Sequence, residues 1–297
     1  MNDLSRGLVR FRIDERDSFR PKDHPTRLSA DPKKKELKES VEQDRERIAE
    51  LQELLYAGGE HAMLLIFQAM DAAGKDSCIG HVLKGVNPEG CRVWSFKAPN
   101  AEELAHDFLW RHAQAIPPRG QLGVHNRSHY EEVLVVKVHP EYLLGQNIPG
   151  IDATNKVSKG FWEKRYASIR HFEEHLAEQG VVVMKFFLNM SKSVQKERLL
   201  ERIEDPAKNW KFKLGDVKER ALWDAYQEAY TSGINATATA HAPWFVVPAD
   251  EQWETRAIVA ALVRERLDAM DLKPPTINAK AKAELEQARK ELGLQGA

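Results

Sequence analysis

The chain of 297 residues is 42% hydrophobic and 30% charged, a globular composition that excludes collagen-like structure and wholesale disorder. Its 44 basic and 45 acidic residues give a net charge of −1, which argues against a general affinity for nucleic acid, and an apolar run such as residues 62–67 is far too short to cross a bilayer. The first residues contain no apolar segment typical of a signal peptide, and Cys78 and Cys91 are too few for a disulfide framework. We therefore expect a cytoplasmic protein that binds neither membrane nor nucleic acid.

Short apolar runs alternate with helical patterns along the chain. Residues 1–30 show no sustained period and are expected to form an extended arm, and an amphipathic helix follows over residues 33–56. The expected strands are residues 62–67, 91–96, 122–125, 181–188 and 244–247. The helices that separate and follow them are expected over residues 75–84, 102–115, 161–179, 194–203, 217–232 and 251–270. This alternation predicts an α/β fold, a parallel sheet of about five strands covered by helices.

The chain is expected to hold one core domain, residues 31–272, because no internal repeat divides it. Residues 273–297 begin at Lys273-Pro-Pro275 and become rich in Ala, Lys, Glu and Gln, with few apolar anchors. This tail predicts a peripheral helix that packs on the body of the fold or on a neighbouring subunit, and we expect a homo-oligomer.

A glycine–lysine loop follows the first predicted strand. Residues 69–77 read Ala-Met-Asp-Ala-Ala-Gly-Lys-Asp-Ser and precede a predicted helix. In such a loop the backbone N–H groups and the helix N-terminus point at phosphate oxygens, and the lysine adds a mobile positive charge. The standard pattern G-x-x-x-x-G-K-[ST] fails at both ends, because Ala69 replaces the first glycine and Asp76 replaces the hydroxyl residue that normally binds magnesium. The predicted phosphate-binding residues of the loop are Met70, Ala72, Ala73, Gly74, Lys75, Asp76 and Ser77.

Two carboxylates accompany this loop. Mg²⁺ prefers oxygen ligands, so Asp71 can replace the missing hydroxyl and is the predicted metal ligand. Asp76 lies in the first turn of the predicted helix, where a surface carboxylate that complements the helix dipole is the alternative interpretation.

Basic residues gather late in the chain. Residues 185–220 hold ten Lys or Arg against six Asp or Glu, a net +4. Arg198 and Arg202 lie on one helical face, where guanidinium groups can bind phosphate bidentately or can pair with neighbouring glutamates. Asp205-Pro206 then offers a hinge. Lys208 and Lys211 follow it on an expected lid, about residues 203–216, that can close over a bound anion.

Further candidates lie near the ends of predicted strands. Asn126 and Arg127 end a strand, where open parallel sheets place ligand-binding groups, although an exposed loop pair is the alternative. Lys84, Lys97 and Arg111 can face phosphate or acceptor nucleotide and are equally consistent with surface charge. His171-Phe-Glu-Glu-His175 matches the zinc pattern H-x-x-E-H, which chance also explains in a chain with 11 histidines.

The loop and three further regions together resemble the polyphosphate kinase 2 family. Residues 67–76 are similar to its first signature, which lies on a P-loop kinase fold similar to thymidylate kinase. Residues 86–90 and 95–99 resemble its connections around the second strand, Asn126-Arg-Ser-His-Tyr130 its Walker B region, and residues 202–211 its lid. The resemblance covers roughly residues 30–270. The Asn126 form, followed by Tyr130-Glu-Glu-Val133, looks like the class III subgroup, whose members accept both AMP and ADP.

The resemblance implies reversible phosphoryl transfer between inorganic polyphosphate and AMP, ADP or ATP, supported by Mg²⁺ or Mn²⁺. It implies that Asp71, Lys75, Arg127 and Arg202 are the catalytic residues and that Asp71 holds the metal. From the residues alone, an ATP-dependent nucleoside monophosphate kinase and a phosphate-binding module without turnover remain alternatives.

Overall fold

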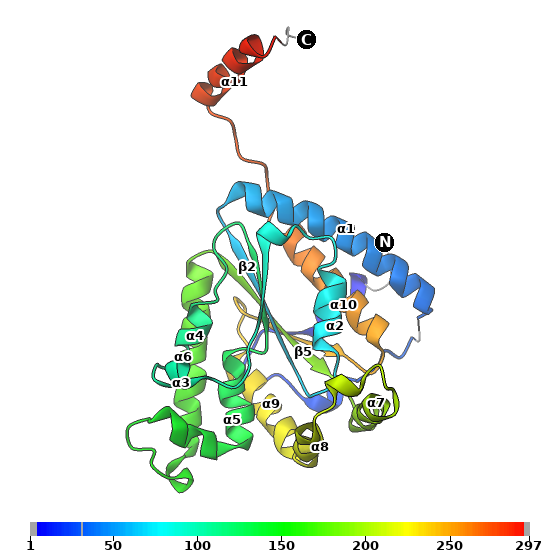
Figure 1. Cartoon of the computed structure of the whole chain (residues 1–297), viewed down its shortest axis with the longest axis vertical. Coiled ribbons are helices and arrows are strands. Elements are labelled where there is room, and N and C mark those ends of the chain that lie inside the picture. Colours follow the sequence, from blue (N-terminus) through cyan, green and yellow to red (C-terminus); the bar gives the residue numbers. More distant parts are fainter. Residues whose placement is uncertain (1–4, 31, 294–297) are drawn as a thin grey trace.

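Over the residues that the structure describes, 5–30 and 32–293, the computed structural model contains one six-stranded sheet in the order β1-β6-β5-β2-β4-β3 (Figure 1). The parallel strands are β2 (Ala62–Ala69), β3 (Cys91–Ser95), β4 (Leu122–Asn126), β5 (Val181–Asn189) and β6 (Trp244–Pro248). The two-residue strand β1 (Arg12–Ile13) adds an antiparallel edge to β6. The α/β prediction is confirmed, with one strand more than expected.

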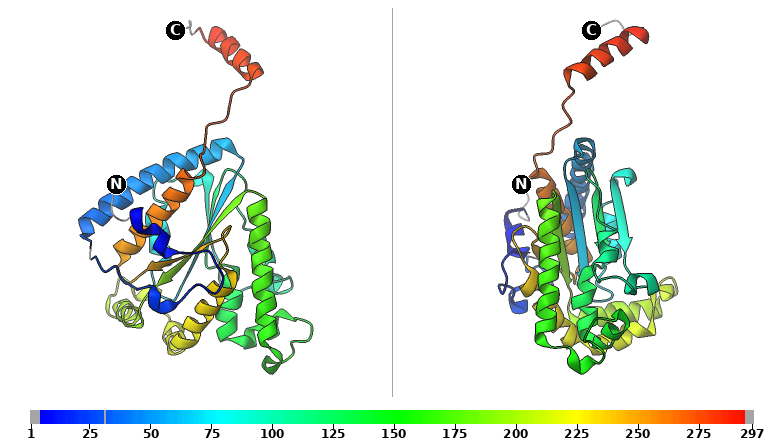
Figure 2. Two further views of the ribbon diagram at one scale, coloured as in Figure 1. Left: turned by 180° about the vertical axis from the view of Figure 1, so that it is seen from behind. Right: turned by 90° about the vertical axis from the view of Figure 1, so that its left-hand side faces the viewer.

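Helices cover both faces of this sheet. The helices are α1 (Lys34–Gly58), α2 (Lys75–Val82), α3 (Ala101–Leu104), α4 (Trp110–Ala113), α5 (Val135–Val138), α6 (Lys159–Glu178), α7 (Lys192–Glu204), α8 (Leu214–Ala221), α9 (Trp223–Thr237), α10 (Gln252–Asp268) and α11 (Ala279–Glu291). Short 3₁₀ helices are η1 (Ser5–Phe11), η2 (Pro21–Asp23), η3 (Pro88–Gly90), η4 (His129–Val133), η5 (Pro140–Gln146), η6 (Thr154–Lys156) and η7 (Asn209–Lys211). Figures 1 and 2 show α1, α2 and α10 on one face and α6 and α9 on the other.

Two helical segments are divided where the sequence predicts continuous helices. Residues 102–115 form α3 and α4, and the Asp107 side chain accepts a hydrogen bond from the Leu109 backbone N–H in the turn between them. Residues 217–232 lie in α8 and α9, which separate at Leu222. None of the residues of α8 is buried, whereas α9 packs several side chains into the core. The expected single helix is therefore divided into an exposed part and a part that packs on the core.

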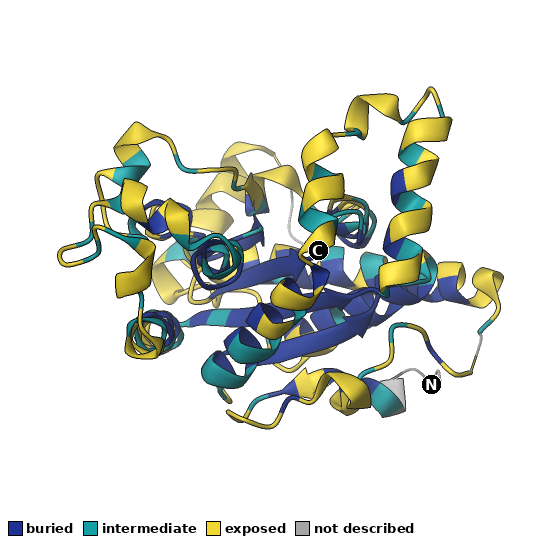
Figure 3. Ribbon diagram, turned by 90° about the horizontal axis from the view of Figure 1, so that it is seen from below, coloured by how far each residue is buried: buried dark blue, intermediate teal, exposed yellow. Residues whose placement is uncertain are grey.

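The centre of the sheet forms the core. Strand β2 is buried along its whole length because it pairs with β4 on one side and β5 on the other. The rings of Phe67 and Phe186 stack there at 4.9 Å. Figure 3 shows the buried strands beneath helices whose outer faces are exposed.

The segment before α1 packs against the body. Leu8, Phe11 and Phe19 are buried in the main core, and Arg12 and Ile13 pair with β6. Its apolar residues are too widely scattered to produce a sequence period, which is why an extended arm is expected over residues 1–30. In the described part of this segment the chain instead forms η1, β1 and η2. The expected domain boundary at residue 31 lies outside the described residues.

The described part of the tail extends away from the body. Helix α11 projects beyond α1 in Figures 1 and 2, and none of its residues is buried. The last four residues of the expected tail, 294–297, lie outside the described range. Within that range, no helix has both the length and the apolar character needed to span a membrane.

The order of the strands places two loops side by side. After β2 the chain passes to β3 and β4 on one side, and later to β5 and β6 on the other. Open α/β sheets bind ligands at such a switch point, outside the carboxyl ends of the strands. Phe67 of β2 is opposite Asn126 of β4, so the segments that leave these strands are neighbours.

Candidate active site

The segment between β2 and α2 forms a tight anion-binding turn. Ala72 and Gly74 adopt left-handed backbone conformations, with φ of 66° and 94°. The turn is closed by the Ala73 N–H, which donates to the Met70 carbonyl at 3.2 Å. Among the described residues, no hydrogen-bond acceptor is bound by the backbone N–H groups of Asp71, Ala72, Gly74 and Lys75. These donors lie at the start of α2, as a phosphate-binding loop requires.

Lys75 is held inside this loop. Its side chain is buried, and Nζ donates to the Ala69 carbonyl at 2.9 Å. Burial is the main cause that lowers the pKa of the Lys75 ammonium, and repulsion from Arg127 lowers it further. Ala69 ends β2 without a left-handed conformation, so the glycine that usually occupies this position is not needed for the turn.

Asp71 and Arg127 face each other across the two strand ends. The Arg127 guanidinium donates to Asp71 Oδ1 at 3.1 Å, and its backbone N–H donates to the Phe67 carbonyl at 3.0 Å. Arg127 has a φ of 65°, an unfavourable conformation for a side chain of this size. Such strain costs roughly 1–3 kcal/mol and clusters at functional sites. The backbone therefore holds Arg127 over the loop at an energetic cost.

Asp76 and Asn126 form a second link between the loop and β4. Asn126 Nδ2 donates to Asp76 Oδ1 at 2.5 Å and lies 3.4 Å from Ser95 Oγ. Asn126 is buried, whereas Asp76 is exposed at the start of α2. The polar ends of β3, β4 and the loop are thus joined in one network.

Glu131 is a site residue for which the sequence analysis assigns no role. It lies in η4 near Arg127 and Lys75. Burial raises the pKa of the Glu131 carboxyl, although the charges of Arg127 and Lys75 oppose the shift. The signal that could have identified it is its position four residues after Arg127, in the segment that leaves the strand.

Arg198 binds the loop itself. Its Nη1 donates to the carbonyls of Ala72 and Ala73 at 3.2 and 3.1 Å, and its Nη2 donates to those of Ala249 and Asp250 at 2.9 and 2.8 Å. The predicted phosphate ligand on α7 therefore has its two terminal amino groups occupied by backbone oxygens. In this arrangement Arg198 stabilises the shape of the loop.

Arg202 links α7 to α8, which begins within the expected lid. It pairs with Asp216 of α8 at 3.0 Å. Burial raises the pKa of the Asp216 carboxyl, and the negative charge of Asp71 raises it further. The charge of Asp71 in the loop therefore reaches Asp216 near the start of α8.

The two lysines of the expected lid make local contacts. Lys208 pairs with Glu201 at 2.5 Å and Asp205 at 3.3 Å, and Lys211 lies 5.0 Å from the ring centre of the exposed Trp210. Neither contact joins them to the loop.

The remaining candidates are not drawn into the loop by these contacts. The Ser77 hydroxyl accepts a hydrogen bond from Arg256 at 2.7 Å. Arg111 donates to the Lys97 carbonyl at 2.8 Å, which keeps these two candidates together near β3. Within the described range, Lys84 is exposed and has no hydrogen-bond or ion-pair partner.

His125 lies in the core, whereas the two histidines of the H-x-x-E-H pattern lie on the surface of α6. The His125 ring is buried and donates to the Ala115 carbonyl at 3.1 Å, and burial lowers the pKa of His125 to about 4. His171, Glu174 and His175 are exposed on α6. In the described part of the chain, no group of three or more His, Cys, Asp or Glu residues is arranged to hold a metal by itself.

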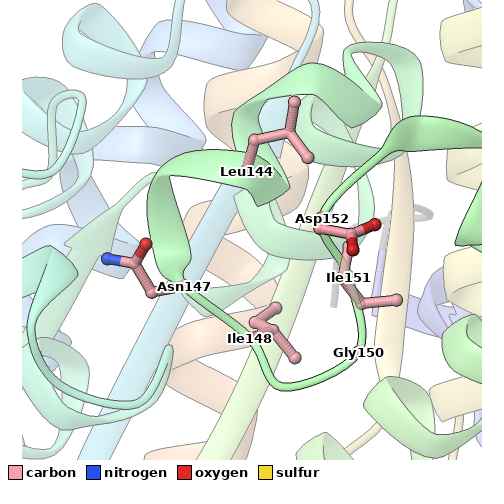
Figure 4. A pocket seen from close by; sticks show the side chains of 6 residues that line it. All are labelled: Leu144, Asn147, Ile148, Gly150, Ile151 and Asp152. Atoms are coloured by element: carbon pink, nitrogen blue, oxygen red, sulfur yellow. The ribbon is translucent and has the colours of Figure 1, made fainter.

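Two hollows lie outside the loop. The one in Figure 4 is lined by Leu144, Asn147, Ile148, Gly150, Ile151 and Asp152, between η5 and η6, and contains none of the predicted site residues. The other includes Phe108, Arg111 and Glu132 in its lining. Of the candidate acceptor residues, Arg111 lines it.

Comparison with known proteins finds relatives over most of this chain, including the loop. The family model described as polyphosphate kinase 2 matches residues 31–275. A relative from Rhodopseudomonas palustris, named ADP-polyphosphate phosphotransferase, is 49% identical over 247 residues, which are 83% of this chain and 84% of that protein. A Meiothermus ruber relative, named AMP/ADP-polyphosphate phosphotransferase, is 47% identical over 229 residues, or 77% of this chain and 80% of its own.

A solved structure shows the same architecture. The crystal structure of polyphosphate kinase 2 from Arthrobacter aurescens TC1 superposes with a TM-score of 0.84 at 37% identity, covering 94% of this chain and 95% of the other. The agreement of the family model, the relatives and the structure extends over the sheet and the phosphate loop. The chain therefore belongs to the polyphosphate kinase 2 family.

Proposed function

We propose that this protein is a polyphosphate-dependent nucleotide kinase, which transfers a terminal phosphoryl group from inorganic polyphosphate to AMP or ADP and can run in reverse from ATP. The observation that carries the proposal is the Asp71–Arg127 pair at 3.1 Å beside the unpaired N–H groups of the loop. The names of the Rhodopseudomonas palustris and Meiothermus ruber relatives support the substrates.

The reaction requires positioning and neutralisation of charge more than covalent participation by the protein. An oxygen of the acceptor phosphate forms a bond to the terminal phosphorus, while the bond from that phosphorus to the bridging oxygen breaks. The bonding electron pair leaves with the shortened polyphosphate. The loop N–H groups and Lys75 bind the transferring phosphate, and Arg127 and Arg202 offset the charge that accumulates when two polyanions approach.

A divalent cation fits the donor set of this site. Mg²⁺ is commonly bound by one or two carboxylates, with waters and substrate phosphates completing its coordination. Asp71 would supply such a carboxylate beside the loop, and Mg²⁺ or Mn²⁺ would neutralise phosphate charge there. The network of oxygen donors around the strand ends agrees with a hard cation.

Further properties belong to the same proposal. The near-neutral net charge of −1 favours local binding of an anionic substrate over the coating of nucleic acid. The projecting α11 supports a homo-oligomer, because none of its residues is buried in the described part of the chain and its Leu285 is exposed.

The direct test supplies AMP, polyphosphate and Mg²⁺ with no ATP. We expect the purified protein to form ADP, measured by chromatography of the nucleotides. ADP formed only when ATP replaces polyphosphate would identify an ATP-dependent monophosphate kinase. Polyphosphate binding with no product under either condition would identify a binding module.

Binding of long polyphosphate should weaken steeply with salt. Each phosphate neutralised by a cation releases a counterion, so contacts with Lys75, Arg127 and Arg202 predict a loss of affinity on the order of tenfold or more for a fourfold rise in salt. Fluorescence anisotropy of labelled polyphosphate measures it. An affinity that does not change over this range contradicts binding through these cations.

A further inference from the structure

At the phosphate loop, the carboxylate of Asp76 and the amide of Asn126 differ from the groups that P-loop enzymes usually carry at these two positions. In P-loop enzymes the residue after the loop lysine supplies a hydroxyl to magnesium, and the neighbouring strand end supplies a carboxylate. Here the position after Lys75 carries the carboxylate of Asp76, and the end of β4 carries the neutral amide of Asn126. We propose that Asp76 is a second carboxylate ligand of the divalent cation and that Asn126 positions it. This inference rests on the proposed function.

The contact between the two side chains supports the exchange. Asn126 Nδ2 donates to Asp76 Oδ1 at 2.5 Å. The amide is buried and also lies 3.4 Å from Ser95 Oγ, so the strand holds its orientation toward α2. A carboxylate and an amide have nearly the same shape, so the pair spans the same gap with the charge on the opposite side.

The charge of Asp76 is left available to a cation. Asp71 is paired with the Arg127 guanidinium at 3.1 Å. Asp76 is bound instead by a neutral donor, and no Lys or Arg in the described part of the chain forms an ion pair with it. Its hydrogen bond uses Oδ1, and the side chain is exposed at the mouth of the loop. Hard divalent cations prefer oxygen ligands of this kind.

A simpler role for Asp76 is to complement the dipole of α2 from its first turn. Asp224 provides a matched comparison, because it is an exposed carboxylate in the first turn of α9. A dipole role predicts that Asp76 and Asp224 behave alike on substitution. A role in cation binding predicts that they differ.

The experiment compares Asp76→Asn, the exchange variant Asp76→Asn/Asn126→Asp, and the control Asp224→Asn. Mn²⁺ is titrated into each protein in the presence of ADP and followed by electron paramagnetic resonance, and thermal unfolding reports the fold. We expect Asp76→Asn to weaken Mn²⁺ binding by about tenfold or more, with Asp224→Asn unchanged. The exchange variant should restore the affinity to within a few-fold of the original, because it returns the carboxylate to the other end of the same contact.

Mn²⁺ affinity that is unaltered in a folded Asp76→Asn protein would overturn the proposal, as would an exchange variant that binds no better than Asp76→Asn. Failure of the proposed function has a different signature. It would leave the original protein unable to form ADP from AMP and polyphosphate, whatever the order of Mn²⁺ affinities among the variants.

Discussion

Replacing Lys75 with alanine is expected to lower the rate of phosphoryl transfer by about 10²- to 10³-fold. Lys75 is buried within the loop, where a charge interacts strongly with a developing negative charge. Asp71→Asn should lower activity as well, because it removes the partner of Arg127 and the predicted metal ligand. ADP formation from AMP and polyphosphate under steady-state conditions gives both rates.

The matched control for this loss is Lys164→Ala, which removes an exposed lysine from α6 on the surface. It should leave the rate unchanged. Near-normal transfer by a folded Lys75→Ala or Asp71→Asn protein would show that the catalytic site is elsewhere. Circular dichroism and thermal unfolding distinguish loss of chemistry from loss of structure.

The Lys185→Met variant is expected to lose about 3–5 kcal/mol of the free energy of unfolding. Lys185 lies on β5 with its ammonium fully buried, and Nζ donates to Glu173 at 2.6 Å, to the Tyr130 hydroxyl at 3.0 Å and to the Thr237 carbonyl at 2.8 Å. Burial alone would raise the pKa of the Glu173 carboxyl, but Lys185 and His129 hold it below its usual value. Removing Lys185 therefore leaves an uncompensated buried carboxylate.

Urea unfolding measures the change as a shift of the midpoint at constant slope. The double variant Lys185→Met/Glu173→Leu should recover most of the loss, because a buried ion pair can be replaced by apolar groups at little cost. A single variant no less stable than the double variant would show that the pair is not the cause. Tyr130 lies in η4, three residues after Arg127, so this buried network also stabilises the segment that leaves β4.

The parallel sheet follows from local patterns. The run of residues 62–67 is continuously apolar because β2 is buried on both faces, and the same reasoning identifies β4, β5 and β6. Strand β1 is too short to carry a period, and it exists because β6 provides a partner. The break between α8 and α9 depends on which side chains reach the core, and that is set by the rest of the fold.

Asp71 and Lys75 could be predicted because they lie in one short loop motif, only four residues apart. Arg127 could be predicted because the strand ends of a parallel sheet meet at one edge. Glu131 and Asp216 depend on packing between distant segments, which spacing alone does not encode. The structural role of Arg198, which holds the shape of the loop, could not be predicted from the sequence for another reason. Its partners are backbone carbonyls, and the identity of the surrounding side chains does not reveal them.

The hydrogen bonds of Arg198 also limit where the expected lid, residues 203–216, could pivot. One guanidinium fastens both the phosphate turn and the segment after β6, so the first half of α7 is anchored to the same rigid frame as the turn. Any swing has to begin beyond this anchor, near Asp205-Pro206, where the helix ends. A long polyphosphate chain could then enter and leave while the phosphate turn beneath it keeps its shape from one turnover to the next.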